Sequence, residues 1–341
     1  MNIAAFSPKN LPQSSRIYFE NISRELTNLG HTVIPFAGKK LPAPVDLYWE
    51  PSTGRNGPNV LLKKTTSPVV VTFHGVANLA LPISECFRSG IQHQLAGYAS
   101  RWISHYGWRE RFYDSMITPS EYAKKEAEIY LGIPAHMLTH IYHGVDYRVF
   151  YPSDVRPKIE PYLLHISSYQ PKKNLERVIA SYLQIPDRLR PRLIIIAPGY
   201  HRSEHIEGIE LIRESLDHKR IALMYQSALG FIFPSLHETF GMPIIEAMAC
   251  GCPVITSNDT GCAEISGNTA LLVNSRSIDD ITNAMIRILT DEQLRQTARE
   301  KGIEHARQFS WSKSAEKHLT VFQKAIQRHC SVNQNNHGGE E

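Results

Sequence analysis

Two glutamates, Glu238 and Glu246, bracket the short sequence Phe-Gly-Met-Pro in the second half of the chain. Upstream, residues 229–233 form a short apolar run rich in aromatic and β-branched side chains, which predicts a buried strand. Downstream, residues 244–250 predict a helix with Pro243 at its first position, where the missing N–H group costs nothing. A strand, a loop and a helix start in this order direct backbone N–H groups and the positive end of a helix dipole toward an anion.

The residues of this stretch combine donors for a phosphate with acceptors for hydroxyl groups. Gly241 has no side chain, so a ligand can approach the N–H groups of Gly241 and Met242 closely. Glu238, on the loop, and Glu246, expected in the first helical turn, supply the acceptors. The alternatives are a solvated loop residue for Glu238 and a mere complement of the helix dipole for Glu246. Taken together, the residues suit a nucleotide sugar.

A second group of residues adds positive charge. The strand predicted at residues 163–166 is followed by a loop containing Lys172, Lys173 and Asn174, and a helix is predicted from Leu175. Two ammonium groups beside a helix N-terminus form a natural diphosphate site, because their charges add to the helix dipole. The alternative is that both lysines are ordinary solvated surface residues.

His74 directly follows the strand predicted at residues 69–73. Polar side chains at the carboxyl ends of parallel strands lie where open α/β sheets bind ligands. The sequence therefore makes His74 a further candidate site residue. The alternative is a histidine that only bonds to the nearby backbone.

The spacing Glu-x₇-Glu around Phe-Gly-Met-Pro resembles the donor-site signature of the retaining glycosyltransferases of family 4, the glycosyl transferases group 1. The residues that follow, Ala-Met-Ala-Cys-Gly-Cys-Pro-Val-Ile-Thr-Ser at 247–257, resemble the helix and next strand of that family. The sequences His-Gly-Val-Asp at 143–146 and Phe-Tyr-Pro at 150–152 resemble its close of the first domain. The resemblance extends over roughly residues 65–325.

The resemblance implies an α/β protein with the GT-B fold, in which two Rossmann-like domains face each other across a cleft. Residues 1–152 would form the acceptor-side domain and residues 153–310 the nucleotide-sugar domain, joined by a linker at 153–161 that is rich in proline and charge. A helix at residues 311–330 would cross back onto the first domain. The polar tail, residues 331–341, is expected to be disordered.

The resemblance also implies a role for each candidate residue. The catalytic residues would be His74, Lys173 and Glu238. The donor would be bound by Lys172, Asn174, Gly241, Met242 and Glu246. Because the family reacts on one face of the sugar with retention of configuration, it needs neither a protein nucleophile nor a metal, and the donor is the only cofactor-like molecule expected.

Three departures from the family pattern keep other functions open. Residues 12–15 lack the usual glycines, Ser167 and Ser168 stand where many members have Gly-Arg, and the strands predicted at 193–197 and 209–212 are too close for a crossover helix. The alternatives are a nucleotide-sugar epimerase of the same fold and an inactive binding or scaffold subunit. A glycosidase fits less well, because it needs its two carboxylates on opposite sides of the scissile bond.

The composition of the chain restricts the class of protein that it can be. The chain has 341 residues, of which 42% are hydrophobic and 21% charged, as expected for two globular domains. No apolar run approaches the ~18 residues of a membrane span, and the start of the chain lacks the layout of a signal peptide. We therefore expect a cytoplasmic protein, with peripheral contact at the inner face of the membrane as an option. The five cysteines follow no disulfide or zinc spacing.

Residues 101–113 interleave cations with aromatic side chains. The favoured interpretation is an amphipathic helix with its aromatic residues in the core, and the alternatives are a membrane-surface helix or a platform for sugar rings. Net charge is +4, which is too small to predict binding to nucleic acid. The expected partners are a nucleotide-sugar donor and a glycan or lipid-linked acceptor, in polysaccharide or lipopolysaccharide assembly.

Overall fold

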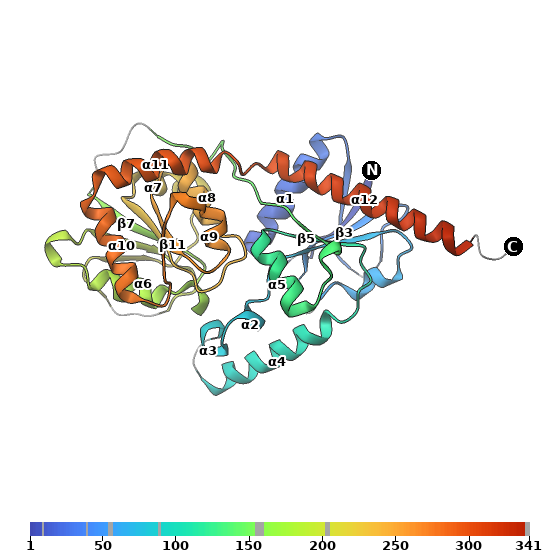
Figure 1. The fold of residues 1–341 in the computed structure, drawn as a ribbon, viewed down its shortest axis with the longest axis horizontal. Helices are drawn as coiled ribbons and strands as arrows, with labels where there is room; N and C mark the ends of the chain where they lie inside the picture. The colour runs from blue at the N-terminus through green and yellow to red at the C-terminus, as the bar shows by residue number, and fades with distance from the viewer. Residues whose placement is uncertain are drawn as a thin grey trace. The chain divides into compact units, whose positions relative to one another are not determined.

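The computed structural model describes residues 1–8, 10–38, 40–53, 57–87, 90–153, 160–201 and 205–337, with side chains as far as residue 331. The chain divides into two compact units, each built around one six-stranded parallel sheet (Figure 1). The first unit contains residues 1–80, 95–144 and 310–341, and the second contains 81–94 and 145–309. The first unit thus ends earlier than the predicted boundary at 152, and most of the predicted linker, residues 154–159, lies outside the described residues.

The sheet of the first unit has the strand order β2-β1-β3-β4-β5-β6. Its strands are β1 (Asn2–Phe6), β2 (Thr32–Phe36), β3 (Leu47–Thr53), β4 (Val69–Phe73), β5 (Ser115–Thr118) and β6 (Leu138–His140). All neighbours are parallel. Every residue of β4 is buried, which explains why four of its five residues are apolar, because parallel sheets are covered on both faces.

Among the helices of the first unit, α5 (Glu121–Leu131) has a clear cap at each end. The helices of this unit are α1 (Gln13–Asn28), α2 (Ala77–Ala80), most of α4 (Ile91–Gly107), α5 and α12 (Trp311–His337), with short 3-10 turns η1 (Val60–Lys64) and η2 (Ala135–Met137). The Ser120 hydroxyl accepts a hydrogen bond from the Ala123 N–H at the start of α5, and Gly132 ends the helix with φ 63°. A serine at the N-cap and a left-handed glycine after the last turn are common helix ends.

The C-terminal helix α12 belongs to the first unit and lies against α1 (Figure 1). This confirms the predicted return of the chain to the first domain. At the return point a Cβ on Gly144 would lie 2.1 Å from the Trp311 nitrogen, so only glycine fits there. The helix continues to His337, so residues 331–337 are helical and not disordered as predicted, because no proline or glycine interrupts the helix before Gly338. Residues 338–341 lie outside the described residues.

The sheet of the second unit has the order β12-β11-β10-β7-β8-β9. Its strands are β7 (Tyr162–Ile166), β8 (Arg192–Ile196), β9 (Ile209–Ile212), β10 (Gly230–Phe233), β11 (Val254–Ser257) and β12 (Leu271–Val273). Strands β8 and β9 are parallel neighbours, with Leu193 opposite Ile209. The short connection between them, noted in the sequence, is therefore compatible with parallel pairing.

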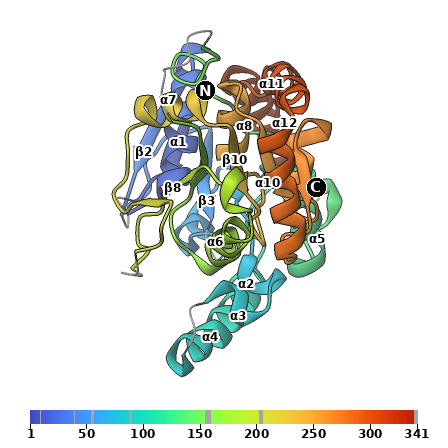
Figure 2. The same cartoon turned by 90° about the vertical axis from the view of Figure 1, so that its left-hand side faces the viewer.

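The helices of the second unit lie beside its sheet in contacting pairs. They are α3 (Ile83–Cys86), α6 (Leu175–Leu183), α7 (His218–Ser227), α8 (Met242–Ala249), α9 (Gly261–Ser266), α10 (Ile278–Thr290) and α11 (Glu292–Ala306), with 3-10 turns η3 (Pro171–Lys173), η4 (Asp187–Leu189) and η5 (Gly267–Thr269). Helices α6 and α10 lie side by side (Figure 2). Helix α9 begins at Gly261, because the Thr260 hydroxyl accepts a hydrogen bond from the Cys262 N–H and caps a helix there.

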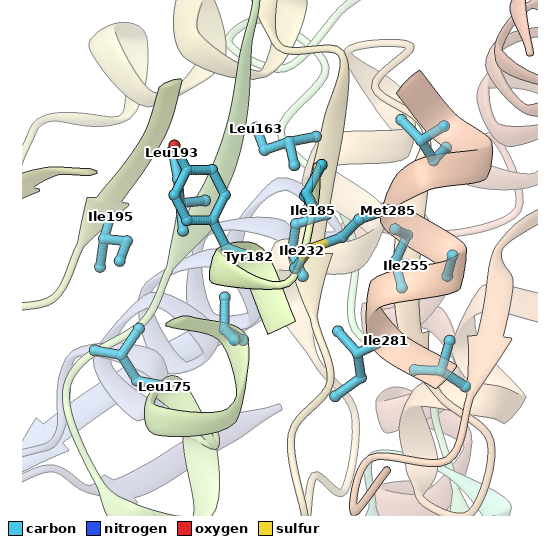
Figure 3. Packing of buried hydrophobic residues seen from close by; sticks show 14 of the residues in the cluster. Leu163, Leu175, Tyr182, Ile185, Leu193, Ile195, Ile232, Ile255, Ile281 and Met285 are labelled. Atoms are coloured by element: carbon cyan, nitrogen blue, oxygen red, sulfur yellow. The ribbon is translucent and has the colours of Figure 1, made fainter. Parts of the chain in front are cut away.

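One apolar cluster fixes the sheet of the second unit against α6 and α10 (Figure 3). Leu163, Ile232 and Ile255 come from the sheet, and Met285 comes from α10. The Tyr182 hydroxyl donates toward Pro191 O at 2.8 Å and Gly208 O at 3.0 Å, and so ties α6 to the starts of β8 and β9. This core holds in place the loops that follow β7 and β10.

The predicted placement of the aromatic residues at 101–113 is partly wrong. Trp108 and Tyr113 are buried, but Trp102 and Tyr106 are exposed on α4. The buried side of α4 is formed by small residues, Gly97, Ser100 and Ser104. Within the described part of the chain, no helix is both long and apolar enough to cross a membrane.

Candidate active site

The loops after β7 and β10 bring the predicted donor-site residues of the second unit together. The 3-10 turn η3, after β7, carries Lys172 and Lys173. The loop after β10 carries Glu238, and its Leu236 N–H donates to Lys172 O at 2.8 Å. Because β7 and β10 are hydrogen-bonded neighbours, residues about 65 positions apart in the sequence share one edge of the sheet.

Lys173 and Glu238 form an ion pair at the centre of this group. The Lys173 Nζ donates to Glu238 Oε1 at 2.5 Å, and the two side chains are only 16% and 12% exposed. The same Nζ lies 5.2 Å from the centre of the Phe233 ring. Burial opposes ionisation of Glu238, but the charges of Lys173 and Lys172 outweigh it and hold the pKa of this carboxyl below its ordinary value. Glu238 is therefore ionised at neutral pH.

The N-terminus of α8 lies at the end of the same loop. Gly241 adopts a left-handed conformation with φ 89° and caps the helix, which begins at Met242. The first N–H groups of a helix have no acceptor within it, so they are available to a bound anion. Because Gly241 starts the helix one residue earlier than predicted, Pro243 is its second residue, and Glu246 lies beyond the first turn instead of within it.

Glu246 is a half-buried residue on α8. Burial alone raises its pKa to about 7. A glutamate placed only to complement the helix dipole would lie in the first turn and in water, and Glu246 meets neither condition. The arrangement favours an acceptor for ligand hydroxyl groups over a solvated charge.

Asn174, predicted to bind the donor, makes its described hydrogen bonds to the loops around it. It adopts φ 65° between η3 and α6, and it is buried. Its Nδ2 donates to Pro234 O at 2.8 Å and to Ser275 O at 2.6 Å. This side chain holds three loops together, and its geometry is that of a positioning residue.

Two further residues of this site were not singled out by the sequence analysis. The Gly261 N–H donates to Glu238 O at 2.8 Å, and a Cβ at Gly261 would lie 2.6 Å from that oxygen. His165 lies on β7, with its Nδ1 2.8 Å from Ile232 O and its Nε2 2.8 Å from the Ser167 hydroxyl. Burial, reinforced by the Lys173 charge, lowers the pKa of His165 to about 4, so the ring is neutral beside the lysine.

His74, in the first unit, lies at the end of β4 as predicted. Its Nε2 donates to Pro51 O at 2.8 Å, an assignment that follows because a carbonyl oxygen only accepts. Burial lowers the pKa of His74, so the imidazole is neutral and Nδ1 carries the lone pair. The ring lies 5.1 Å from that of Tyr18 and 5.8 Å from that of His143.

A cluster of buried polar rings surrounds His74, and only the fold brings its members together. Tyr18 comes from α1, His143 from the end of the stretch 95–144, and His318 from α12. The Tyr18 hydroxyl lies 2.5 Å from His318 Nε2 and 3.1 Å from the Thr72 hydroxyl. Burial lowers the pKa of His318 to about 4 and that of His143 well below its ordinary value. The cluster is therefore uncharged.

Two family models match the chain in tandem. The model for glycosyl transferases group 1 matches residues 152–305, and the model for Glycosyltransferase Family 4 matches residues 51–149. The first match contains every donor-site residue of the second unit, and the second contains His74.

Among curated relatives, O-antigen chain mannosyltransferase B of Escherichia coli is 26% identical over 227 residues. The match covers 61% of this chain and 60% of that protein. The chain therefore spans less than two thirds of the length of this relative.

Solved structures resemble the whole fold. A sucrose-phosphate synthase from Thermosynechococcus elongatus superimposes with a TM-score of 0.73 at 19% identity, covering 96% of this chain and 99% of that one. Anabaena HepE in complex with UDP-glucose gives a TM-score of 0.64 at 17% identity, covering 97% of this chain and 100% of that one. The chain contains two parallel six-stranded sheets, and its fold matches these solved structures over nearly its whole length. The predicted GT-B architecture is therefore confirmed.

Proposed function

The chain belongs to the group 1 glycosyltransferases, and from this premise we propose that it transfers a hexose from a nucleoside-diphosphate sugar to a hydroxyl group with retention of anomeric configuration. The acceptor is a glycan or a lipid-linked glycan. The observation that carries the proposal is the buried Lys173–Glu238 ion pair, which shares a loop with the N-terminus of α8. That combination offers cations and N–H donors to a diphosphate and a carboxylate to the adjoining sugar.

The donor is held by groups of complementary charge. Lys172, Lys173 and the N–H groups of Gly241 and Met242 bind the diphosphate and stabilise the negative charge that develops on it as it leaves. Glu246 accepts the ribose hydroxyls, as acidic residues do in other Rossmann-type sites. Glu238 accepts a hydroxyl of the sugar next to the diphosphate.

Retention follows when the acceptor enters on the face from which the diphosphate leaves. The bond from the anomeric carbon to the phosphate oxygen breaks, the bond to the acceptor oxygen forms, and the acceptor proton passes to the departing phosphate oxygen. His74 accepts a sugar hydroxyl through Nδ1 and takes no proton in this scheme. The lysines and the helix N-terminus balance the leaving charge, so the proposed reaction needs no metal.

The decisive experiment combines a donor panel with product stereochemistry. Thermal shifts are measured with GDP-mannose, because the Escherichia coli relative is a mannosyltransferase, and with UDP-glucose, which HepE holds. ADP- and TDP-sugars complete the panel. A donor at 100 times its dissociation constant stabilises the protein by about 2.7 kcal/mol, which is readily measured.

The stabilising donor is then incubated with a synthetic lipid-linked glycan, and the anomeric carbon of the first-formed product is examined by NMR. An α-linked donor should give an α-linked product, and excess EDTA should leave the rate unchanged. A β-linked product would overturn the mechanism. Loss of activity on chelation, restored by Mg²⁺, would show that the lysines do not suffice.

The same assay separates the two alternatives. An epimerase would give a new sugar product without any acceptor present. A binding or scaffold subunit would be stabilised by a donor and yet show no turnover with any acceptor.

A further inference from the structure

A short segment from the first half of the chain belongs to the second unit. Residues 81–94 group with residues 145–309, and they contain the short helix α3 (Ile83–Cys86). Helix α3 lies against the 3-10 turn η3, which carries Lys172 and Lys173. The lysine turn therefore has a neighbour from outside the main run of its own unit.

Arg276 binds α3 to the rest of the second unit. Its Nη2 donates to Glu85 Oε2 at 2.8 Å and its Nε donates to Glu85 Oε1 at 3.3 Å, although the two residues are 191 positions apart in the sequence. A guanidinium that contacts both oxygens of a carboxylate fixes the orientation of the pair as well as its distance. The Glu85 side chain is only 18% exposed, so water and salt screen this pair less than an ordinary surface pair.

The loop that carries Arg276 is also bonded to the lysine turn. Asn174 directly follows η3, and its Nδ2 donates to Ser275 O at 2.6 Å, next to Arg276. The Leu236 N–H donates to Lys172 O at 2.8 Å. The turn is thus bonded to the loops after β10 and β12, and α3 is bonded to the second of these loops.

We propose that Glu85 and Arg276 are positioning residues for the donor. Their ion pair holds α3 against η3, and α3 in turn keeps Lys172 and Lys173 in the position that binds the diphosphate. This inference rests on the proposed function, because it takes the two lysines as the cations of the donor site. Neither Glu85 nor Arg276 needs to touch the donor itself.

Asp259 allows this role to be separated from a general effect of charge. Arg276 Nη1 also donates to Asp259 Oδ2 at 3.3 Å, but Asp259 lies in the loop after β11 and not on α3. Glu85→Ala and Asp259→Ala each remove one negative charge beside the same arginine, so their general electrostatic effects on a bound diphosphate are similar. Glu85→Ala alone also detaches α3 from Arg276.

The test is a double-mutant cycle, with nucleotide binding measured by isothermal titration with GDP, UDP, ADP and TDP. Glu85→Ala and Arg276→Ala should each raise the dissociation constant of the nucleotide that the parent binds by about three- to tenfold. The double variant should bind no more weakly than the weaker single variant, because one pair is broken only once, whereas independent contributions would multiply. Asp259→Ala should change the dissociation constant by less than about twofold.

Arg192→Ala is the matched control for the loss of an arginine. Arg192 also lies between two carboxylates, with Nε 3.4 Å from Glu160 Oε2 and Nη1 3.5 Å from Glu210 Oε2. Its side chain is 44% exposed, against 40% for Arg276. Arg192 begins β8, and because β7 and β8 are parallel it lies at the opposite edge of the sheet from η3. Its loss should change nucleotide affinity by less than about twofold.

Hydrogen exchange without nucleotide tests the contact of α3 itself. The Phe87 N–H donates to Ile83 O at 2.9 Å at the end of this helix. Exchange at this amide should be at least about threefold faster in Arg276→Ala than in the parent, and unchanged in Arg192→Ala. In transfer assays the donor KM of Arg276→Ala should rise by the same factor as the dissociation constant, with kcat within about twofold of the parent, because α3 lies against the turn and not against the reacting atoms.

Unchanged nucleotide affinity in Glu85→Ala and Arg276→Ala would overturn the inference and leave the proposed function intact. Multiplicative losses in the double variant, unchanged exchange at Phe87, or a loss in Asp259→Ala equal to that in Glu85→Ala would overturn it as well. A parent that binds none of the four nucleotides would overturn the proposed function, and this role of Glu85 and Arg276 with it.

Discussion

Lys173 and Glu238 neutralise each other in a site that is built for an anion. Each is mostly buried, and the charge of Lys173 helps to hold the pKa of Glu238 below its ordinary value. A bound diphosphate would add a second anion beside Lys173. Lys172 and the N-terminus of α8 would help to stabilise its negative charge. The chemistry therefore depends on individual side chains that the rest of the loop keeps in place.

Lys173→Ala should lower kcat by roughly 10²–10³-fold, because it removes a cation that faces charge developing on the leaving group. Lys301→Ala, on the exposed surface of α11, is the control and should leave the rate unchanged. Steady-state kinetics with the identified donor measures both. Activity of Lys173→Ala within threefold of the parent would mean that the lysine only pairs with Glu238.

If Glu246 binds the donor as proposed, donor affinity should depend on pH. The carboxylate must be ionised to accept two ribose hydroxyls, yet burial raises its pKa to about 7. A raised pKa means that the unliganded protein holds the proton below that pH, so binding must release it. Donor affinity should fall as the pH drops through 7, by up to about tenfold per pH unit.

Isothermal titration between pH 5.5 and 8, in buffers of different ionisation enthalpy, measures both the affinity and the proton release. Glu246→Gln should bind the donor more weakly and lose this pH dependence, with a smaller change in turnover at saturating donor. A pH-dependent affinity that survives in Glu246→Gln would assign the titration to another group.

At the scale of elements, the donor loop is held by its neighbours in the sheet and by α9. The Gly261 N–H bonds to Glu238 O, and the Gly261 Cα hydrogens face two carbonyl oxygens of that loop, those of Glu238 and Thr239. Backbone atoms cannot move aside as a flexible side chain can. The first turn of α9 therefore fixes the position of the Glu238 backbone.

Gly261→Ala should displace the loop, because its Cβ would lie 2.6 Å from both carbonyl oxygens. We expect a loss of about 1–3 kcal/mol of stability together with a reduced kcat. Gly302→Ala is a matched control, since its Cβ would meet Met248 at an ordinary 3.5 Å within α11. Urea unfolding and transfer assays measure both variants. Full activity and stability in Gly261→Ala would show that the loop can shift to make room for the added Cβ.

At the scale of the whole molecule, the first unit is closed by residues from both ends of the chain. Tyr18 on α1 meets His318 on α12, 300 positions later, inside the ring cluster around His74. The C-terminal helix is thus part of the core of the first unit and contributes directly to the surroundings of His74.

Tyr18→Phe keeps the ring and removes the hydroxyl that lies between His318 and Thr72. Because both partners are buried and would be left without this bond, we expect a loss of about 1–3 kcal/mol of stability. Tyr130→Phe, at an exposed tyrosine of α5, is the control and should unfold with the parent. Unchanged unfolding of Tyr18→Phe would mean that the cluster is held by packing alone.

The sequence by itself determined the elements and the donor motif, because their signals are local. Ser120 and Gly132 mark the ends of α5 within a few residues, and the apolar run of β4 records burial on both faces of its sheet. The two lysines and the two glutamates are recognisable because the members of each pair are close in the sequence, at 172 and 173 and at 238 and 246.

Only the tertiary structure decided which residues meet across long separations. The pairing of β7 with β10 joins Lys173 to Glu238, and the return of α12 joins His318 to Tyr18. The outward turn of Trp102 was likewise mispredicted, because the same amphipathic pattern fits either side of α4 facing the core. Hydrogen bonds from Asn78 to Ser100 and Ser104 select the polar side, and a partner 22 or more residues away leaves no periodic trace in the sequence of the helix.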